Sequence, residues 1–336
     1  MRMDSAELRR YAEGRGGERI GLTLARRKPY PSHMTIDKID TIDAATVPVV
    51  TSIAELGSEY RAWLVDIWGV MHNGREAFAS AVAATRAFRA SGGIVIMLSN
   101  SPRPSDAVQT QLLSFGVPDD AYDATVTSGD LTRHELAKHE GARVYHLGPE
   151  RDKPIFAGMD VHLVGADDAE LVVCSGLFDD ETETPDDYRG LLSDLAARKV
   201  PMICANPDHR VERGSDLVYC AGALASLYEE FGGEVVYAGK PYHPVYELAL
   251  ETIRMLAGEK VPREAILAIG DGVNTDIAGA ASFGVDAVFV ASGLHVPSPA
   301  TGQRNELGHE PLDARHLMQL FTNVPPPRAA MRTLAW

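Results

Sequence analysis

The stretch ILAIGDGVNTDI, residues 266–277, decides the fold that this sequence predicts. Its first part is apolar, as expected of a strand that is covered on both faces of a sheet. Asp271 follows directly, and Asp276 lies five residues further on. Because ligands in α/β proteins bind at the carboxyl ends of parallel strands, this stretch predicts a central strand and part of a site.

Outward from this stretch, short apolar runs alternate with longer amphipathic stretches, which is typical of α/β units around a parallel sheet. We expect strands at residues 62–66, 94–98, 143–147, 171–174, 201–205, 235–238, 265–269 and 287–290. We expect helices at residues 77–90, 104–115, 131–139, 185–198, 222–231, 244–256, 275–283 and 312–321. The tail after Gly293 is rich in Pro and polar residues and is expected at the periphery.

The composition of the 336 residues is that of a globular protein and excludes several classes. With 32 basic and 47 acidic residues the net charge is -15, and such a surface repels phosphate backbones and anionic membranes. No nucleic acid and no membrane is therefore expected as a partner. The 3 cysteines form no C-x-x-C pair, so a reducing cytoplasm is the expected location.

The N-terminus differs from the rest of the chain. Residues 1–28 hold eight basic and four acidic side chains without a sustained apolar period. A nucleic-acid or targeting patch is one interpretation, and a solvated extension over residues 1–47 is the one that we favour.

Polar side chains follow several of the predicted strands. They are Asp66, the pair Ser99 and Asn100, Lys240, and Asp271 with Asp276. Carboxylates are ligands that suit Mg²⁺, a lysine neutralises anionic charge, and a hydroxyl with backbone N–H groups holds phosphoryl oxygens. Each residue alone is an ordinary turn, cap or surface residue. Their order after successive strands predicts a divalent-cation and phosphate site.

These motifs resemble those of the haloacid dehalogenase (HAD) superfamily of hydrolases, and more narrowly its class IIA branch of sugar-phosphatase-like proteins related to the NagD type. The resemblance covers residues 62–293, and its motifs are Asp66-Ile67-Trp68-Gly69-Val70, Ser99-Asn100, Asn206-Pro207-Asp208, Gly239-Lys240-Pro241 and Gly270-Asp271 with Asp276. It implies an α/β fold with a doubly wound parallel-sheet core, residues 48–127 and 235–336, and an inserted α/β cap, residues 128–234.

The resemblance also implies roles around the nucleophile. Asp66 would attack phosphorus and form an aspartyl-phosphate, with Ser99 and Lys240 holding the phosphoryl group and Asn100 assisting. The expected cofactor is Mg²⁺. Its protein ligands would be Asp66, the backbone carbonyl of Trp68 and Asp271, and Asp276 would be either a further ligand or a residue that supports the ligands.

The cap implied by the resemblance would set the specificity for a small phosphorylated metabolite. Asn206, Asp208 and Arg210 are the candidate substrate contacts, although an ordinary turn with an exposed arginine explains them equally well. The sequence leaves open whether the protein forms a homodimer.

Trp68 departs from the family pattern, because phosphatases that resemble this chain carry Asp-x-Asp and the second Asp acts as general acid and base. An indole cannot take that role, and the loss of a general acid and base lowers the rate about 10²- to 10⁴-fold. Three interpretations follow: a slow phosphatase in which another group such as His72 supplies the proton, a dehalogenase-like carbon–halogen hydrolase, or a phosphate-binding or regulatory protein without turnover.

Overall fold

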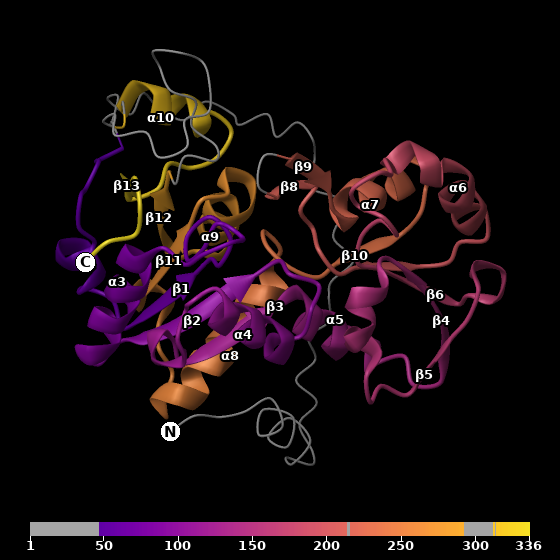
Figure 1. Ribbon diagram of the computed structural model, residues 1–336, viewed down its shortest axis with the longest axis horizontal. Helices are drawn as coiled ribbons and strands as arrows, with labels where there is room; N and C mark the ends of the chain where they lie inside the picture. The colour runs from indigo at the N-terminus through magenta and orange to yellow at the C-terminus, as the bar shows by residue number, and fades with distance from the viewer. Residues whose placement is uncertain (1–46, 214–215, 292–311, 313) are drawn as a thin grey trace.

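The computed structural model describes residues 47–213, 216–291, 312 and 314–336. The predicted N-terminal extension lies outside these ranges except for Val47. Within them, two parallel sheets lie side by side along the long axis of the molecule (Figure 1). The α/β class with parallel sheets, predicted from the alternation in the sequence, is confirmed.

The larger sheet has six parallel strands and is built from both ends of the chain. Its strands in spatial order are β13 (Ala329–Met331), β12 (Asp286–Val290), β11 (Ile266–Gly270), β1 (Ala62–Val65), β2 (Ile94–Ser99) and β3 (Ala124–Thr127). We call this sheet with its helices the core lobe.

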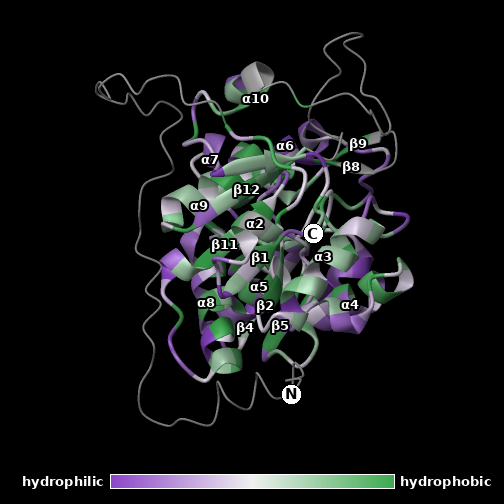
Figure 2. Ribbon diagram, turned by 90° about the vertical axis from the view of Figure 1, so that its left-hand side faces the viewer, coloured by the Kyte–Doolittle hydropathy of each residue, from purple (hydrophilic) through white to green (hydrophobic). Residues whose placement is uncertain are grey.

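Alternate residues of each central strand enter different clusters on the two faces of this sheet. In β1, Ala62 and Leu64 belong to one buried cluster, whereas Trp63 and Val65 belong to the other. This period of two follows from the geometry of a strand, and a run without polar residues results because both faces are covered. Figure 2 shows β1 and β11 as apolar strands at the centre of the molecule.

Helices cover both faces of the six-stranded sheet. One face packs against α3 (Ala79–Ala90) and α4 (Ser105–Ser114), and the other packs against α5 (Ser128–Leu136), α8 (His243–Ala257) and α9 (Ala278–Phe283). This arrangement is that of a doubly wound sheet. Two further helices of this lobe are α2 (Ala54–Gly57) and α10 (Ala314–Leu320).

The second lobe is built from the middle of the chain around a five-stranded parallel sheet. Its strands in spatial order are β10 (Val235–Tyr237), β7 (Met202–Cys204), β6 (Leu171–Cys174), β4 (Ala142–Leu147) and β5 (Val161–Leu163). The helices α6 (Arg189–Ala197) and α7 (Ala221–Glu230) cover one face. An antiparallel hairpin, β8 (Arg210–Arg213) and β9 (Asp216–Tyr219), extends from this lobe.

The two lobes share one apolar cluster. Val173 and Ile203 of the second lobe belong to the same buried cluster as Leu98 and Val245 of the core lobe. Burial of apolar surface is the main favourable term in folding, so this shared cluster holds the two sheets together.

Several short helices complete the described structure. They are the 3₁₀ helices η1 (Asp119–Ala121), η2 (Glu150–Phe156), η3 (Ala166–Asp168), η4 (Pro185–Tyr188) and η5 (Arg263–Ala265), and the π-helix η6 (Val273–Ile277). Of the helices that the structure describes, none is long and apolar enough to cross a bilayer.

The C-terminal tail differs from its prediction. It was expected at the periphery, but β13 is an edge strand of the six-stranded sheet, and Ala329, Ala330 and Met331 are buried. The division into a core and an inserted cap stays a prediction. Its second core segment begins at residue 235, whereas β10 pairs with β7 in the second lobe.

Trp63 provides a test of the core packing. Its ring stacks on Phe88 with centroids 3.9 Å apart, and its indole N–H donates to the carbonyl oxygen of Gly57 at 3.3 Å. Trp63→Ala should lower the free energy of unfolding by about 3–5 kcal/mol, measured by urea denaturation. Leu113→Ala is the surface control because Leu113 is 58% exposed, and its loss of stability should stay below about 1 kcal/mol. Equal losses would contradict this packing account.

Candidate active site

The predicted polar residues meet where the strand order of the larger sheet reverses. Strand β1 lies between β11 and β2. After β1 the chain continues through β2 and β3 to one edge of the sheet, and after β11 it continues through β12 and β13 to the other edge. Asp66, Ser99 and Asp271 therefore come to one crevice, because each lies at the carboxyl end of one of these adjacent parallel strands. Such a switch point is where α/β proteins place ligands.

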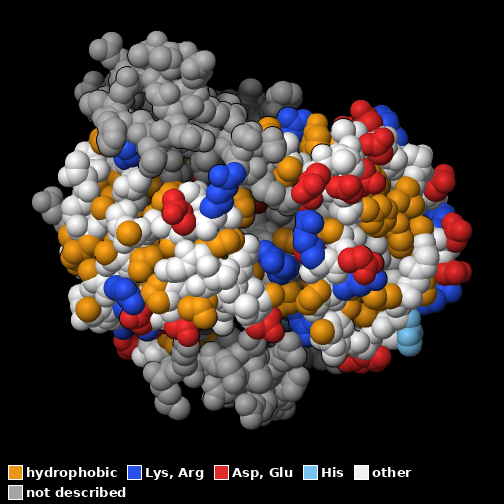
Figure 3. All heavy atoms as spheres, viewed as in Figure 1, with side chains coloured by type: hydrophobic (Ala, Val, Ile, Leu, Met, Phe, Trp, Pro, Cys, Tyr) orange, Lys and Arg blue, Asp and Glu red, His pale blue; other side chains and the backbone are white. Residues whose placement is uncertain are grey.

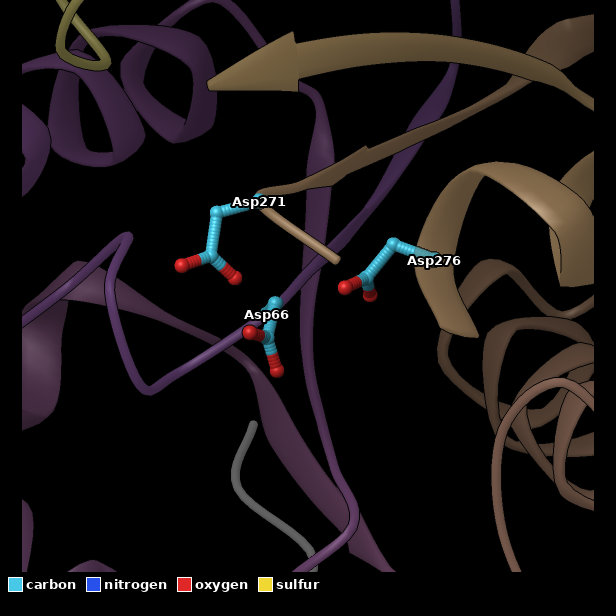
Figure 4. A group of neighbouring side chains, drawn as sticks. All are labelled: Asp66, Asp271 and Asp276. Atoms are coloured by element: carbon cyan, nitrogen blue, oxygen red, sulfur yellow. The ribbon is translucent and has the colours of Figure 1, made fainter. Parts of the chain in front are cut away.

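Three buried carboxylates lie together in this crevice. Oxygens of Asp66, Asp271 and Asp276 lie within 4.8 Å of one another, and Figure 4 shows the three side chains directed into a common space. Asp276 comes from the π-helix η6. Short π-helical segments occur frequently at functional sites, and η6 is consistent with this tendency.

Lys240 joins two of the carboxylates. Its ammonium group, Nζ, donates to Asp66 Oδ1 at 2.6 Å and to Asp276 Oδ1 at 2.8 Å, and the lysine side chain is only 3% exposed. Burial alone lowers the pKa of Lys240, but the negative charges of Asp276 and Asp66 outweigh it and raise the pKa above its usual range. The lysine is therefore charged at neutral pH.

Three buried carboxylates lie together, and the Lys240 ammonium contacts two of them, Asp66 and Asp276. Burial raises the pKa of Asp66 well above its usual range, and Asp276 and Asp271 add to the rise against the opposite effect of Lys240. A cation beside these oxygens favours the ionised carboxylates, so this donor set fits a divalent ion.

Asn100 connects the two lobes at the site. Its Oδ1 accepts the backbone N–H of Lys240 at 2.7 Å, and its Nδ2 donates to the Lys240 carbonyl oxygen at 3.1 Å. The same Nδ2 donates to Asp208 Oδ1 at 2.9 Å. Ser99 beside it is buried, and its Oγ accepts the backbone N–H of Ser101 at 3.1 Å. Asp208, from the second lobe, is thereby placed against the core-lobe residues.

The other candidate substrate contacts lie differently. Asn206 is buried, and its Oδ1 accepts the backbone N–H of Asp208 at 3.0 Å. Arg210 is exposed on β8, where its guanidinium group lies over the ring of Tyr219, 4.2 Å from the ring centroid. No contact between Arg210 and the carboxylate group is present among the described residues.

Trp68 packs onto its own loop. Its ring meets His72 edge-on with centroids 5.2 Å apart, and the space above Gly74 is filled by the indole. His72 is 2% exposed, and its Nδ1 accepts the backbone N–H of Gly74 at 3.0 Å. Burial lowers the pKa of His72 to about 4, so the imidazole is neutral at pH 7.

Sequence reasoning missed two residues that shape the site. Gly69 has a left-handed φ of 80°, and a Cβ there would lie 2.0 Å from Asp271 Oδ2. Ser128, at the start of α5, donates to Asn100 Oδ1 at 3.4 Å. The Asp-Ile-Trp-Gly motif was a signal for Gly69, whereas Ser128 follows a strand, β3, that the sequence pattern did not predict.

Basic side chains lie on the surface between the two lobes. Figure 3 shows Lys and Arg side chains there on the face in view. Positive side chains near a crevice favour the approach of an anion to an otherwise acidic protein.

Comparisons with known proteins agree with this geometry. The model of a family described as haloacid dehalogenase-like hydrolase matches residues 63–162, and a HAD-hydrolase-like model matches residues 237–311. A crystal structure of a hydrolase of the haloacid dehalogenase-like family from Brucella suis 1330 is 44% identical to this chain. The match covers 85% of this chain and 99% of that chain, with a TM-score of 0.74.

Two curated proteins are similar over a shorter part of the sequence. The 5'-nucleotidase YutF of Bacillus subtilis is 26% identical over 238 residues, which are 70% of this chain and 88% of that protein. An acid sugar phosphatase of Staphylococcus saprophyticus is 27% identical over 241 residues, with the same two shares of 70% and 88%.

Gly69 provides a test of the close approach between the loop after β1 and Asp271. A left-handed backbone costs an alanine about 1–2 kcal/mol. Gly69→Ala should lower the free energy of unfolding by clearly more than this amount, because the added methyl group also displaces the Asp271 carboxylate. Gly92→Ala is the matched control, since Gly92 has a φ of 94° and nothing within 4 Å of its added Cβ. Urea denaturation of both variants measures the difference, and equal losses would refute the contact.

Proposed function

We propose, because this chain belongs to the haloacid dehalogenase-like family of hydrolases, that it hydrolyses a small phosphate monoester with the help of Mg²⁺. The observation that carries the proposal is the buried contact of the Lys240 ammonium with Asp66 and Asp276 beside Asp271. The similarity to a nucleotidase and a sugar phosphatase favours a phosphorylated metabolite of sugar-phosphate size as the substrate.

Asp66 is the proposed nucleophile. Its carboxylate is fixed by Lys240 at 2.6 Å, and its backbone N–H donates to the carbonyl oxygen of Ile269 at 2.8 Å. Attack on phosphorus would give an aspartyl-phosphate at Asp66 and release the alcohol. Positioning and charge neutralisation supply most of the rate in such transfers, and a nucleophile held between two central strands suits that requirement.

The proposed ligands of Mg²⁺ are Asp66, Asp271, Asp276 and the backbone carbonyl oxygen of Trp68. Oxygens of the three buried carboxylates lie within 4.8 Å of one another, and the Trp68 oxygen accepts no hydrogen bond from the described residues. Oxygen donors of this kind are those that Mg²⁺ prefers. When bound, the ion would neutralise charge that develops on the phosphoryl oxygens.

Ser99, Asn100 and Lys240 are the proposed phosphoryl-binding residues. All three are buried at the carboxyl end of β2 or beside it, and Asn100 fixes the backbone of Lys240 through two hydrogen bonds. We further propose that the second lobe acts as a cap. Asn206, Asp208 and Arg210 would contact the rest of the substrate, with Asp208 lying nearest to the phosphoryl site because it contacts Asn100.

Trp68 stands at the position of the usual general acid and base, so turnover is expected to be slow. A carbon–halogen hydrolase would leave the group of Asp271 and Asp276 without a role, because displacement of halide by a carboxylate needs no cation. The phosphatase therefore accounts for more of the site than the dehalogenase does.

Asp66→Asn tests the proposed nucleophile. Release of inorganic phosphate from a panel of phosphate monoesters should fall to background, because a carboxamide does not attack phosphorus. Asp186→Asn is the matched control, since the Asp186 side chain is 82% exposed, and its activity should equal that of the wild type. If the wild type releases no phosphate from any ester but binds phosphate, a binding role replaces this proposal. If the wild type releases chloride from 2-haloacids, a dehalogenase function replaces this proposal.

Removal of the cation tests the proposed metal site. Dialysis against EDTA should abolish phosphate release, and added Mg²⁺ should restore it. Asp271→Asn should raise the Mg²⁺ concentration for half-maximal activity at least about tenfold, since each ligating carboxylate contributes charge to the site. Asp186→Asn should leave that concentration unchanged. Full activity in EDTA would contradict the metal-dependent scheme.

A further inference from the structure

The proposed reaction lacks a proton donor in the segment where one is expected. When the bond between phosphorus and the ester oxygen breaks, an alkoxide leaves unless it receives a proton. Trp68 has no group that exchanges protons, and the nearby His72 is buried, with its Nδ1 accepting the N–H of Gly74. The proton therefore has to come from a different part of the molecule.

We propose that Asp208 is the general acid and base of this site, which the second lobe supplies in place of the carboxylate absent at position 68. The proposal rests on the phosphatase function proposed above. Asp208 would protonate the leaving alcohol in the first step and accept a proton from water in the second.

Asp208 lies on the side of the phosphoryl site that faces the second lobe. Asn100 Nδ2 donates to its Oδ1 at 2.9 Å, and the same asparagine binds the backbone of Lys240, whose ammonium contacts the nucleophile at 2.6 Å. Two residues thus separate the Asp208 carboxyl group from Asp66. An in-line displacement requires the leaving group to point away from Asp66, and in this proposal it points toward Asp208.

The backbone around Asp208 is held in place. Its N–H donates to Asn206 Oδ1 at 3.0 Å, and its carbonyl oxygen accepts the N–H of Gly222 at the start of α7 at 3.1 Å. Pro207 packs against Gly239, where an added Cβ would lie only 2.7 Å from the proline ring. A general acid has to be placed within hydrogen-bond reach of its target, and these contacts fix the turn at the seam between the lobes.

The carboxyl group of Asp208 is suited to proton exchange. It is half-buried, and no described residue donates to its Oδ2, since Asn100 contacts Oδ1 only. Burial raises the pKa of Asp208 to about 6, with Asp276 and Asp271 adding to the rise against Asn100 and Lys240. Both protonation states are then populated near neutral pH, which is the condition for a group that acts as acid and then as base.

The proton balance of the two steps closes. In the first, Asp66 forms a bond to phosphorus, the bond from phosphorus to the ester oxygen breaks, and the proton of the Asp208 carboxylic acid passes to that oxygen. In the second, the oxygen of a water forms a bond to phosphorus, one proton of that water passes to the Asp208 carboxylate, and the bond from phosphorus to Asp66 breaks. The products are an alcohol and inorganic phosphate, and Asp66 is regenerated.

The test compares two leaving groups in Asp208→Asn. The first-turnover rate is measured by rapid mixing with 4-nitrophenyl phosphate, whose phenolate leaves without a proton, and with the best alkyl phosphate found for the wild type. The alkyl phosphate should slow about 10²- to 10⁴-fold, while the initial burst of nitrophenolate should stay within a factor of about three. Asp208→Glu keeps the carboxyl group and should lose far less on the alkyl phosphate.

Other results would overturn the assignment. Equal losses on both substrates would make Asp208 a residue that positions the site, and no loss on the alkyl phosphate would mean that another group supplies the proton. Because both substrates are measured on one variant preparation, partial unfolding cannot mimic the predicted difference. Failure of the phosphatase proposal itself is distinct, since the wild type would then hydrolyse neither substrate.

Discussion

The contact of the Lys240 ammonium with Asp66 and Asp276 is the interaction on which the site depends. It joins residues that lie 174 and 36 positions apart in the sequence, and all three side chains are buried. A buried ion pair is costly unless each charge is paired and hydrogen-bonded. Here the two carboxylates pair with one ammonium, and the remaining negative charge is what makes a cation binding site reasonable.

Lys240 also links the two lobes. Strand β10 ends at Tyr237 in the sheet of the second lobe, and three residues later Lys240 lies among residues of the core lobe. Asn100 binds the Lys240 backbone and the Asp208 carboxylate at once. The apolar cluster shared by the lobes also holds the two lobes together. Any movement of the second lobe would therefore shift Asp208 and Lys240 relative to each other.

The sequence pattern predicted the central strands closely, because a strand buried on both faces is a short run of apolar residues. The strand predicted at 171–174 has those bounds in β6. The pattern did not predict β3, whose sequence Ala-Thr-Val-Thr has little apolar contrast, or β13, whose Ala329 and Ala330 are buried by tertiary packing alone. The sequence predicted one site from the order of Asp66, Ser99, Lys240 and Asp271 after successive strands. The contact of Asn100 with Asp208 was not, because no local pattern encodes how one lobe meets the other.

The central claim is that phosphoryl groups pass through Asp66, and mass spectrometry of the acid-quenched protein tests it most directly. After rapid mixing with substrate and Mg²⁺, a peptic digest should contain the peptide that includes Asp66 with the added mass of one phosphoryl group, and Asp66→Asn should lack it. Release of phosphate without this modified peptide, or a phosphoryl group on a different residue, would contradict the account.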